Sequence, residues 1–452
     1  MKRIVILGGG FGGLYTLNYL KKALNKSKFV NFNYKIQNPI KLELINEHQY
    51  FLFTPLFPEI ATGSVPVDIS LELLFKVVKN NNYKFIWGKV EKIDLDEKII
   101  YFRKQVKNES LKGFLNKIHI LKQTDFSLGQ LTSISYDYLV IALGGKTNFY
   151  NIPGSEKYAY DLKSIKDVIV LKKHFKNMFD MANLYLKEKN NDHLSSKLNE
   201  YLTFVIVGGG PTGVEMAGEM SDLFYKIFKK FYSLYLVSKA KIILIEKSKD
   251  LISQFQYEFR QKALEILRNK KIEIYFQKSV SEVGKNFIKL ETGEVIKTKT
   301  VIWTAGIIPN LPEILGKVEK DEKGRLIVNQ FLQLKNYENV FALGDIACFI
   351  QNEKPLSQLA QVATKEARIV CLNILNMINN RPLRKFVYHH SGDLISIGHF
   401  YALGSIGKVK IFGFFAWFLW KAVYFFKIFS FKNKFKFLIN WFFNVISRQY
   451  LD

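Results

Sequence analysis

The sequence predicts an α/β protein with two Rossmann-like dinucleotide-binding domains and, behind them, C-terminal amphipathic membrane-anchoring helices. The prediction rests on an aromatic tail at 411–443 and on two glycine-rich motifs, Gly8-Gly9-Gly10-Phe11-Gly12-Gly13 and Gly208-Gly209-Gly210-Pro211-Thr212-Gly213. Each motif follows a short apolar run and precedes a helical pattern, so its glycines can turn tightly and bring a pyrophosphate to a helix N-terminus. Because the motifs lie one domain length apart, we expect two nucleotides in one molecule and electron transfer between them.

The charge of the chain indicates the kind of surface it meets. The chain has 452 residues, enough for two or three domains, and its 66 basic and 40 acidic residues give a net charge of +26. Such a charge favours polyanionic surfaces. Since no nucleic-acid-binding motif accompanies it, we expect an anionic lipid membrane surface and no nucleic acid. An A/T-rich genome that loads lysine codons is the alternative explanation.

The number of cysteines and the N-terminal sequence indicate where in the cell the protein is expected. Cys348 and Cys371 are the only cysteines and neither belongs to a CxxC motif, which is typical of a reducing compartment. The first expected strand begins at Arg3, which leaves no room for a signal peptide, and no apolar run reaches the roughly 20 residues of a spanning helix. We expect a peripheral (monotopic) protein on the cytoplasmic face of a bacterial inner membrane, or an organelle-encoded equivalent.

The first domain is expected to begin with a strand at 3–7, a glycine turn and a helix, and to continue with a strand at 41–46. In this fold an acidic side chain at the end of the second strand usually binds a ribose. Asn46 occupies that position and Glu47 follows it, so Glu47 is the candidate ribose ligand. The alternative for Glu47 is an ordinary surface glutamate.

Residues 50–63 combine two prolines and a glycine with large apolar side chains. This composition excludes a regular helix and predicts a packed loop that contains Thr54 and Pro55. The shape of this loop is expected to fit against a flat group. Further strands are expected around 85–104 and 133–143, and the second of these leads into Ala142-Leu143-Gly144.

The second domain is expected to start at Thr203, with its own second strand at 241–245. That strand ends in Glu246, at the position where this fold usually binds a ribose. Because a carboxylate there repels the 2′-phosphate of NADPH, we expect the nucleotide of this domain to be NADH. A strand at 301–303 leads into Ala305-Gly306.

A later strand, at 339–343, ends in Gly344-Asp345 and is expected to return to the first domain. At the edge of a sheet, Asp345 can accept a hydrogen bond from a ribityl hydroxyl while the adjacent amide meets a phosphate. A helix is expected at 357–379.

The tail interleaves many Phe and Trp residues with Lys421, Lys427, Lys432, Lys434 and Lys436. Its longest uncharged run, Ile411–Trp420, is too short to span a bilayer. We expect a pair of interfacial helices with aromatic side chains inserted and lysines at the headgroups, each lysine contributing on the order of 1 kcal/mol. A buried core helix or a dimer helix is the alternative.

These features together resemble the type II NADH:quinone oxidoreductases along nearly the whole chain. The motifs that carry the resemblance are 8–13, Phe53-Thr54-Pro55-Leu56, Ala61-Thr62-Gly63, 208–215, 303–306, Gly344-Asp345, Ala360-Gln361-Val362-Ala363 and 413–420. The resemblance implies a monotopic, often homodimeric enzyme with non-covalent FAD, which oxidises NADH and reduces a membrane quinone without pumping protons. It places Glu215 by the nicotinamide ring and Gln361 near the flavin and the quinone.

The sequence departs from the family pattern at three positions. Asn46 replaces the expected acid, Leu143 replaces a usual threonine, and Lys365 stands where a second glutamine is common. The change at Asn46 affects the expected contact with the ribose of FAD. The change at Lys365 affects the expected contacts near the quinone.

The expected domains are an FAD-binding domain at 1–165 and 321–385, an NADH-binding domain at 166–320 and a membrane-association region at 386–452. The candidate catalytic residues are Glu215 and Gln361. The candidate FAD ligands are Gly8, Gly10, Phe11, Gly12, Gly13, Glu47, Thr54, Pro55, Ala142, Gly144, Gly344, Asp345 and Ala363. The candidate NADH ligands are Gly208, Gly210, Pro211, Thr212, Gly213, Glu246, Ala305 and Gly306.

Hydride transfer needs nicotinamide C4 within roughly 3–3.5 Å of flavin N5 and little acid–base help, so a catalytic triad is not required. The histidines show no metal-like spacing, and no metal is expected. Glu215 has two possible roles, proton relay and orientation of the NADH amide. The alternative functions are a sulfide:quinone oxidoreductase, a naphthoquinone-specific NAD(P)H reductase and a non-enzymatic redox flavoprotein like the apoptosis-inducing factors.

Overall fold

The computed structural model describes residues 1–25, 39–78, 83–107, 126–188, 194–407, 409–428 and 430–447. The chain forms two compact units. Unit 1 contains residues 1–52, 72–146 and 307–389, and unit 2 contains residues 53–71, 147–306 and 390–452. These borders differ from those expected at 165, 320 and 385, because the chain changes unit near 146 and 306 and the tail groups with unit 2.

Unit 1 is built on one mixed sheet with the strand order β20-β21-β8-β1-β2-β5-β6-β7, and β18 pairs with β5. The strands from β21 to β5 are parallel neighbours, and β5, β6 and β7 pair antiparallel. Because β21 pairs with β8, the chain returns to the first sheet after the second glycine motif, as the sequence predicts. The strands are β1 (Lys2–Leu7), β2 (Ile40–Asn46), β5 (Tyr83–Asp94), β6 (Ile99–Lys107), β7 (Phe126–Ser135), β8 (Tyr138–Ile141), β18 (Glu313–Leu315), β20 (Gln333–Leu334) and β21 (Tyr337–Ala342).

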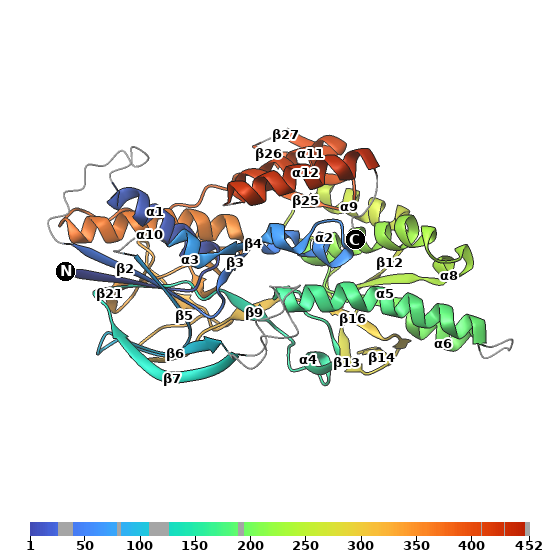
Figure 1. Ribbon diagram of the computed structural model, residues 1–452, viewed down its shortest axis with the longest axis horizontal. Coiled ribbons are helices and arrows are strands. Elements are labelled where there is room, and N and C mark those ends of the chain that lie inside the picture. The colour runs from blue at the N-terminus through green and yellow to red at the C-terminus, as the bar shows by residue number, and fades with distance from the viewer. Residues whose placement is uncertain are drawn as a thin grey trace. The chain divides into compact units, whose positions relative to one another are not determined.

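The core of unit 1 lies along its central strands. Residues 4–7 of β1 and 139–141 of β8 are apolar and fully buried, as in parallel strands covered on both faces. Helices α1 (Phe11–Leu24) and α10 (Ala360–Ile378) pack against each other and lie on the same side of this sheet (Figure 1).

The other elements of unit 1 are short and connect this framework. They are β3 (Tyr50–Leu52), α3 (Leu74–Val77), β17 (Ile307–Pro309), β19 (Leu326–Ile327), β22 (Ala347–Cys348), β23 (Ile350–Gln351), β24 (Lys354–Pro355) and the 3₁₀ helix η7 (Gly344–Ile346). Strands β4 (Leu71–Leu73) and β9 (Gly145–Thr147) lie where the chain changes unit.

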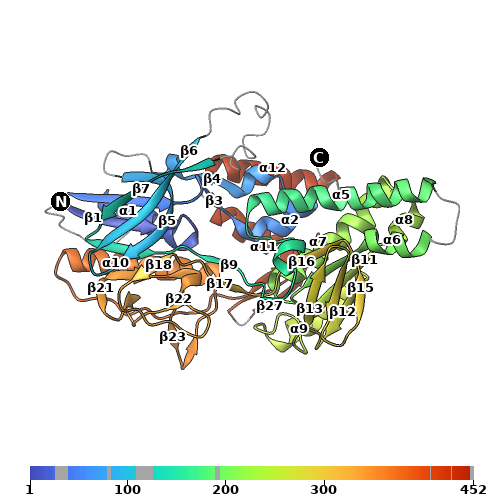
Figure 2. The same ribbon diagram turned by 90° about the horizontal axis from the view of Figure 1, so that it is seen from below.

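Unit 2 contains a second parallel sheet, ordered β12-β11-β10-β16, and an antiparallel meander, β13-β14-β15. Apolar side chains of both sheets, among them Val205, Ile243, Val283 and Ile288, form one buried core between them. Figure 2 shows the meander beside the parallel strands. The strands are β10 (Thr203–Val207), β11 (Lys241–Glu246), β12 (Ile272–Phe276), β13 (Val280–Gly284), β14 (Phe287–Leu290), β15 (Val295–Lys297) and β16 (Thr300–Trp303).

The helices of unit 2 include the one that follows the second glycine motif, α7 (Pro211–Asp222), which continues as one π-helical turn, η5 (Leu223–Ile227). The others are α4 (Ser155–Tyr158), α5 (Ile165–Glu188), α6 (Leu194–Leu202), η6 (Phe228–Lys230), α8 (Leu234–Lys239) and α9 (Tyr257–Asn269).

The segment 50–63 is not entirely loop, contrary to the expectation from its prolines. It forms a 3₁₀ turn, η1 (Thr54–Leu56), and a buried helix, α2 (Phe57–Thr62), and is followed by η2 (Val67–Ser70). Pro58 lies in the first turn of α2, where a backbone N–H would have no acceptor within the helix, so the lack of an N–H in proline costs no hydrogen bond. Gly63 ends the helix with φ +86°.

The tail of unit 2 forms a small antiparallel sheet and the expected helix pair. The strands β25 (Leu394–Ser396), β26 (Ala402–Ile406) and β27 (Val409–Gly413) precede α11 (Phe414–Lys427) and α12 (Phe431–Ser447). These helices lie next to β25–β27 (Figure 1). Within the described ranges, no helix is long and apolar enough to cross a membrane.

Each tail helix has a buried stripe and an exposed apolar stripe. Asn433, Phe437 and Asn440 of α12 are buried at helical spacing, as are Trp417 and Trp420 of α11. Large apolar side chains are exposed on the remaining surface of the pair, at Phe414, Phe415, Phe418, Phe426, Phe431, Phe435, Leu438, Ile439 and Phe442.

Candidate functional site

The first glycine motif turns the chain from β1 into α1 in unit 1. Gly8 has φ +99°, and a Cβ on it would lie 2.2 Å from the carbonyl oxygen of Ala142, so only glycine fits. Gly10 is the N-cap of α1, has no side chain to cap the first turn, and faces open space among the described residues. A helix N-terminus with space in front of it fits the pyrophosphate of a dinucleotide.

Asn46 lies at the end of β2 and is held against this turn. Its Oδ1 accepts a hydrogen bond from the backbone N–H of Gly9 at 2.8 Å, and its Nδ2 donates to the carbonyl of His48. The carboxylate of Glu47, one residue later, lies 3.8 Å from Lys89 Nζ and is 40% exposed.

The Gly344-Asp345 turn follows β21, next to β8 in the same sheet. A Cβ on Gly145 would lie 3.3 Å from Asp345, and one on Gly344 would lie 3.5 Å from Ala363 of α10. Thus Ala142, Gly144, Asp345 and Ala363 gather near the carboxyl ends of parallel strands, where open α/β sheets bind their ligands. Gln361 lies in the first turn of the same helix, α10.

A glutamate that the sequence analysis did not select supports this turn. Glu366 is 3% exposed and accepts a hydrogen bond from the N–H of Gly344 at 2.7 Å. Burial raises the pKa of Glu366 to about 7. A small cavity beside it is lined in part by Gln358 and Val362.

The second glycine motif has the same geometry in unit 2. Gly208 has φ +107°, and a Cβ on it would lie 2.9 Å from the backbone of Ala305, which follows β16. Gly210 is the N-cap of α7 and again faces open space among the described residues. The motif therefore fits a second pyrophosphate.

Glu246 ends β11 and is fixed by two backbone donors. One carboxylate oxygen accepts from the N–H of Gly209 at 2.6 Å and the other from the N–H of Ser248 at 2.7 Å. Its charge is therefore held beside the glycine turn. Gly306, with φ +83°, approaches the hydroxyl of Tyr150.

Thr54 and Pro55 belong to unit 2, whereas the other candidate FAD ligands belong to unit 1. Thr54 is exposed and Pro55 is partly buried, whereas Phe53 before them is buried.

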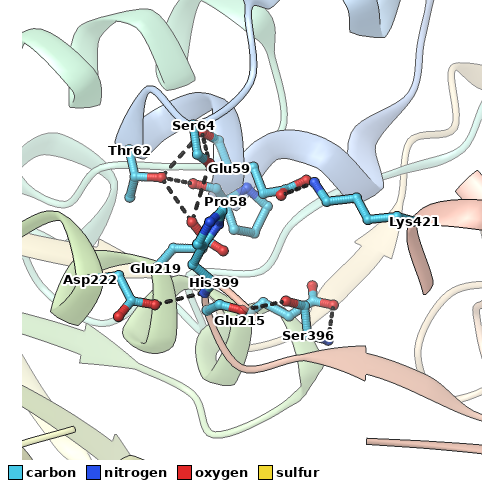
Figure 3. Close-up of polar contacts among 11 residues, drawn as sticks. Pro58, Glu59, Thr62, Ser64, Glu215, Glu219, Asp222, Ser396, His399 and Lys421 are labelled. Carbon is cyan, nitrogen blue, oxygen red and sulfur yellow. Dashed lines mark hydrogen bonds and ion pairs between the residues drawn. The ribbon is translucent and has the colours of Figure 1, made fainter. Parts of the chain in front are cut away.

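A cluster of acidic residues lies along one face of α7, in which Glu59, Glu219 and Asp222 are buried and Glu215 is partly buried (Figure 3). Glu215, Glu219 and Asp222 share that face because they are spaced by four and three residues. Glu219 and Asp222 are 2% and 1% exposed, and Glu59 of α2, which lies in the same cluster, is 4% exposed.

Glu215 and Glu219 are shifted toward their neutral forms. Burial raises the pKa of each to about 8, and the negative charge of Glu59 adds to the effect on both. Oε1 of Glu215 is 3.4 Å from the N–H of Ser396, which donates to it. A carboxyl group with a pKa near 8 can carry a proton at neutral pH, which suits proton relay, one of the two roles considered for Glu215.

Lys421 of α11 enters this cluster instead of reaching the membrane headgroups, contrary to the expectation for that lysine. It is 3% exposed and forms an ion pair with Glu59. Its ammonium group also lies over the rings of Trp420 at 5.1 Å and Phe437 at 5.3 Å. A buried lysine is tolerated because its charge is paired.

The sequence could have indicated part of this cluster. The spacing of Glu215, Glu219 and Asp222 places three acids on one side of the helix after a glycine turn, a pattern that a periodicity search detects. The pair Glu59–Lys421 joins residues 362 positions apart, and neither position has a local signal.

Comparison with known proteins identifies the fold. Residues 2–367 match the family model for pyridine nucleotide-disulphide oxidoreductases, and residues 390–449 match the NDH2 C-terminal domain. The chain belongs to the pyridine nucleotide-disulphide oxidoreductase family. The predicted α/β fold with two dinucleotide-binding units is confirmed.

Relatives cover almost the whole chain. A probable NADH dehydrogenase of Dictyostelium discoideum is 28% identical over 97% of this chain and 88% of its own length. The type II NADH:quinone oxidoreductase Ndh of Mycobacterium tuberculosis is 27% identical over 97% and 87%. The structure of NDH2 from Plasmodium falciparum in complex with NADH superposes with a TM-score of 0.82 at 20% identity, covering all of both chains. The resemblance to type II NADH:quinone oxidoreductases, stated from the motifs, is confirmed.

Proposed function

We propose that the protein is a type II NADH:quinone oxidoreductase, which takes a hydride from NADH and passes two electrons through FAD to a membrane quinone without pumping protons. The observation that carries this proposal is the pair of glycine turns, each beside a ribose-side polar residue, in a chain that also has an NDH2 C-terminal domain.

FAD fits the glycine turn of unit 1. Gly8, Gly10, Phe11, Gly12 and Gly13 would hold its pyrophosphate at the N-terminus of α1. The other candidates are Glu47, Thr54, Pro55, Ala142, Gly144, Gly344, Asp345 and Ala363. The open space in front of Gly10 and the close approach of Gly8 to Ala142 support this assignment. The flavin supplies the step from two-electron hydride chemistry to quinone reduction.

NADH fits the glycine turn of unit 2. Gly208, Gly210, Pro211, Thr212 and Gly213 would hold its pyrophosphate, and Ala305 and Gly306 would line the site. Glu246 would accept hydrogen bonds from the ribose hydroxyls, because its carboxylate is fixed and charged. The same charge disfavours a 2′-phosphate and therefore NADPH.

Glu215 is the candidate for proton relay, and its raised pKa favours that role over orientation of the NADH amide. Gln361, at the start of α10, is assigned to the flavin and quinone side. Because hydride transfer depends on positioning, the glycine turns and Glu246 contribute mainly by fixing the nucleotide.

The exposed apolar stripe of α11 and α12 suits a lipid surface. Its aromatic side chains would insert into the interface, and Lys427 and Lys432, which are exposed, would meet anionic headgroups. We assign the protein to the cytoplasmic face of a bacterial inner membrane or an organelle-encoded equivalent, as a homodimer.

Sulfide:quinone chemistry is not favoured. It needs two redox cysteines beside the flavin, and Cys348 and Cys371 are both buried and unbonded to each other. Burial raises the pKa of the Cys371 thiol strongly, which makes it a poor nucleophile.

Anaerobic stopped-flow spectroscopy of the membrane-bound protein tests the proposal. We expect NADH to bleach the flavin much faster than NADPH does, and added ubiquinone or menaquinone to restore the oxidised spectrum. Reduction by sulfide with no response to NADH would establish the sulfide alternative. A long-lived charge-transfer complex that quinones do not discharge would favour a non-enzymatic flavoprotein.

A further inference from the structure

Segment 396–399 of the tail lies against α7, the helix that follows the second glycine motif. We propose that Gly218 of α7 is a positioning residue for Glu215. Because Gly218 has no side chain, segment 396–399 approaches closely enough for the backbone N–H of Ser396 to hold the Glu215 carboxyl group. This inference rests on the proposed function for the role of Glu215, but the contact itself can be tested without it.

The backbones of α7 and segment 396–399 meet at a pair of glycines. A Cβ on Gly218 would lie 2.6 Å from the carbonyl carbon of Ile397 and 2.7 Å from the backbone nitrogen of Gly398. From the other side, a Cβ on Gly398 would lie 2.7 Å from the carbonyl oxygen of Gly218. These distances are shorter than an ordinary carbon contact of about 3.5 Å, and backbone atoms cannot rotate out of the way. A side chain at position 218 would therefore push the segment off the helix.

Two hydrogen bonds flank this glycine pair (Figure 3). Glu215, Gly218 and Asp222 lie on one face of α7 because they are spaced by three and four residues. Asp222, one turn after Gly218, accepts a hydrogen bond from the N–H of His399 at 2.7 Å. Oε1 of Glu215, one turn before Gly218, accepts from the N–H of Ser396 at 3.4 Å. The segment is therefore held to α7 at three successive points.

The N–H of Ser396 points toward α7 because of the place of β25 in its sheet. Strand β25 is at the edge of the sheet β25-β26-β27. Ile397 donates its N–H to the carbonyl of Tyr401 at 2.9 Å, and successive N–H groups of a strand point to opposite sides, so that of Ser396 points away from β26. Ser396 is 2% exposed, and a buried backbone N–H needs an acceptor. The Glu215 carboxyl group supplies it.

The bond from Ser396 to Glu215 is sensitive to the position of the segment. At 3.4 Å it is already longer than the roughly 2.7–3.2 Å of most N–H···O bonds. An alanine at position 218 would move the segment by several tenths of an ångström, and Ser396 would move with it. Glu215 would lose the donor that fixes Oε1. Because the positions of reacting groups control the rates of hydride and proton transfer, this loss should slow catalysis.

Transient kinetics of the holoenzyme test the positioning role. Glu215→Ala identifies which half-reaction uses Glu215, flavin reduction by NADH or reoxidation by ubiquinone. We expect Gly218→Ala to slow the same half-reaction about tenfold and the other one not at all. In the double variant we expect no further slowing, because a residue that acts through another has a non-additive effect.

Two kinetic results would overturn the proposal. One is that Gly218→Ala slows the reaction equally with and without Glu215. The other is that Glu215→Ala slows neither half-reaction, which would leave Glu215 with no role. Gly404→Ala in β26 is the matched control, because its Cβ would meet the end of the Leu394 side chain, which can rotate, and not α7. We expect wild-type rates in this control.

The pH dependence of the slowed half-reaction separates positioning from a general loss of structure. Burial raises the pKa of Glu215 to about 8, and the hydrogen bond from Ser396 acts in the opposite direction. Without this donor the pKa should rise further, so we expect the pH midpoint of the rate to move upward in Gly218→Ala. An unchanged midpoint would contradict the proposal. The other ionisable groups that face Glu215 are not substituted in this variant, namely Glu59, Glu219 and Tyr424.

Amide hydrogen exchange of the holoenzyme, measured by mass spectrometry, tests the contact without reference to catalysis. We expect exchange over residues 396–399 to be about tenfold faster in Gly218→Ala than in wild type or Gly404→Ala. Glu215→Ala should also speed exchange at Ser396, whereas Glu215→Gln should not, because its amide oxygen still accepts the bond.

The comparison of Glu215→Ala with Glu215→Gln decides the contact even if Gly218→Ala does not fold. Equal exchange at Ser396 in these two variants would show that Glu215 does not hold this N–H and would overturn the proposal. If NADH does not reduce the wild-type flavin, or ubiquinone does not reoxidise it, the proposed function fails. The exchange measurements still decide in that case whether segment 396–399 holds Glu215.

Discussion

Asn46 accepts a hydrogen bond from the backbone N–H of Gly9 at 2.8 Å. Glu246 accepts the corresponding bond from Gly209 at 2.6 Å, so an amide in unit 1 occupies the place that a carboxylate occupies in unit 2. The amide keeps the bond to the glycine turn without a negative charge. It also presents Nδ2 as a donor, which a carboxylate lacks.

This geometry predicts which residue supports FAD binding. We expect Asn46→Ala to weaken FAD binding about fivefold, because one hydrogen bond of about 1 kcal/mol is lost from the glycine turn. Reconstitution of the apoprotein with FAD, followed by flavin fluorescence, measures the affinity.

Glu47→Gln is the matched comparison. Its carboxylate is 40% exposed and 3.8 Å from Lys89, so we expect a change below about twofold. A larger loss of FAD in Glu47→Gln than in Asn46→Ala would instead assign the ribose to Glu47.

The sequence predicted the glycine turns and the parallel strands well because these are local patterns. Gly8 and Gly208 must be glycine for steric reasons, and residues 4–7 are a buried apolar run that reads as a strand. The two prolines and the glycine of the segment 50–63 predict a loop, but helix α2 forms there because a proline in the first turn costs no hydrogen bond.

Glu246 should control the choice between NADH and NADPH. We expect Glu246→Gln to lower the ratio of kcat/KM for NADH over NADPH about tenfold or more, because the charge that repels the 2′-phosphate is removed. Steady-state assays with ferricyanide as acceptor give the ratio. Glu265→Gln is the control variant, because Glu265 is exposed and paired with Lys262. An unchanged ratio in Glu246→Gln would mean that another residue distinguishes the ribose of NADH from that of NADPH.

The acid cluster was only partly predictable. The resemblance to type II NADH:quinone oxidoreductases indicated Glu215, and Glu219 and Asp222 share its face by helical periodicity. The burial of Lys421 could not be predicted, because its partner Glu59 is on a different element. The composition of the tail predicts that Lys421 lies at the lipid headgroups. In the folded protein its ion pair with Glu59 holds it in the interior instead.

The raised pKa of Glu219 predicts a pH dependence of stability. The folded protein binds the carboxyl proton of Glu219 with a pKa of about 8, whereas the ordinary value is 4.5. Between these values the unfolded chain has released the proton and the folded protein keeps it, so the stabilising contribution is full below pH 4.5 and is lost as the pH rises through about 8.

Glu219→Gln should remove this dependence. We expect its Tm, relative to wild type, to be higher at pH 8.5 than at pH 5, as measured by calorimetry. A difference in Tm that does not change with pH would indicate that Glu219 has an ordinary pKa.

The buried pair Glu59–Lys421 should stabilise the attachment of α11. We expect Lys421→Met or Glu59→Gln alone to lower the free energy of unfolding by about 3–5 kcal/mol, because either leaves one buried charge unpaired. The double variant should regain much of the loss. Urea denaturation of the four proteins gives the coupling energy, and additive losses would show that the two charges do not interact.

Membrane attachment is best tested by point substitutions, because deleting the tail from about residue 405 would also remove Trp417, Trp420 and Lys421 from the interior of unit 2. Phe415, Phe426 and Phe431 are 77%, 74% and 83% exposed, so their replacement by serine removes apolar surface without opening a core.

We expect the triple variant Phe415→Ser, Phe426→Ser and Phe431→Ser to bind anionic lipid vesicles at least about a thousandfold more weakly, since each inserted aromatic side chain contributes about 1.5–3 kcal/mol. Phe231→Ser is the matched control, because Phe231 is 73% exposed but lies outside α11 and α12. Vesicle co-sedimentation at low and high salt separates aromatic insertion, which persists at high salt, from lysine attraction, which salt screens. Equal loss of binding in the control and the triple variant would mean that the membrane surface of the protein is not centred on this helix pair.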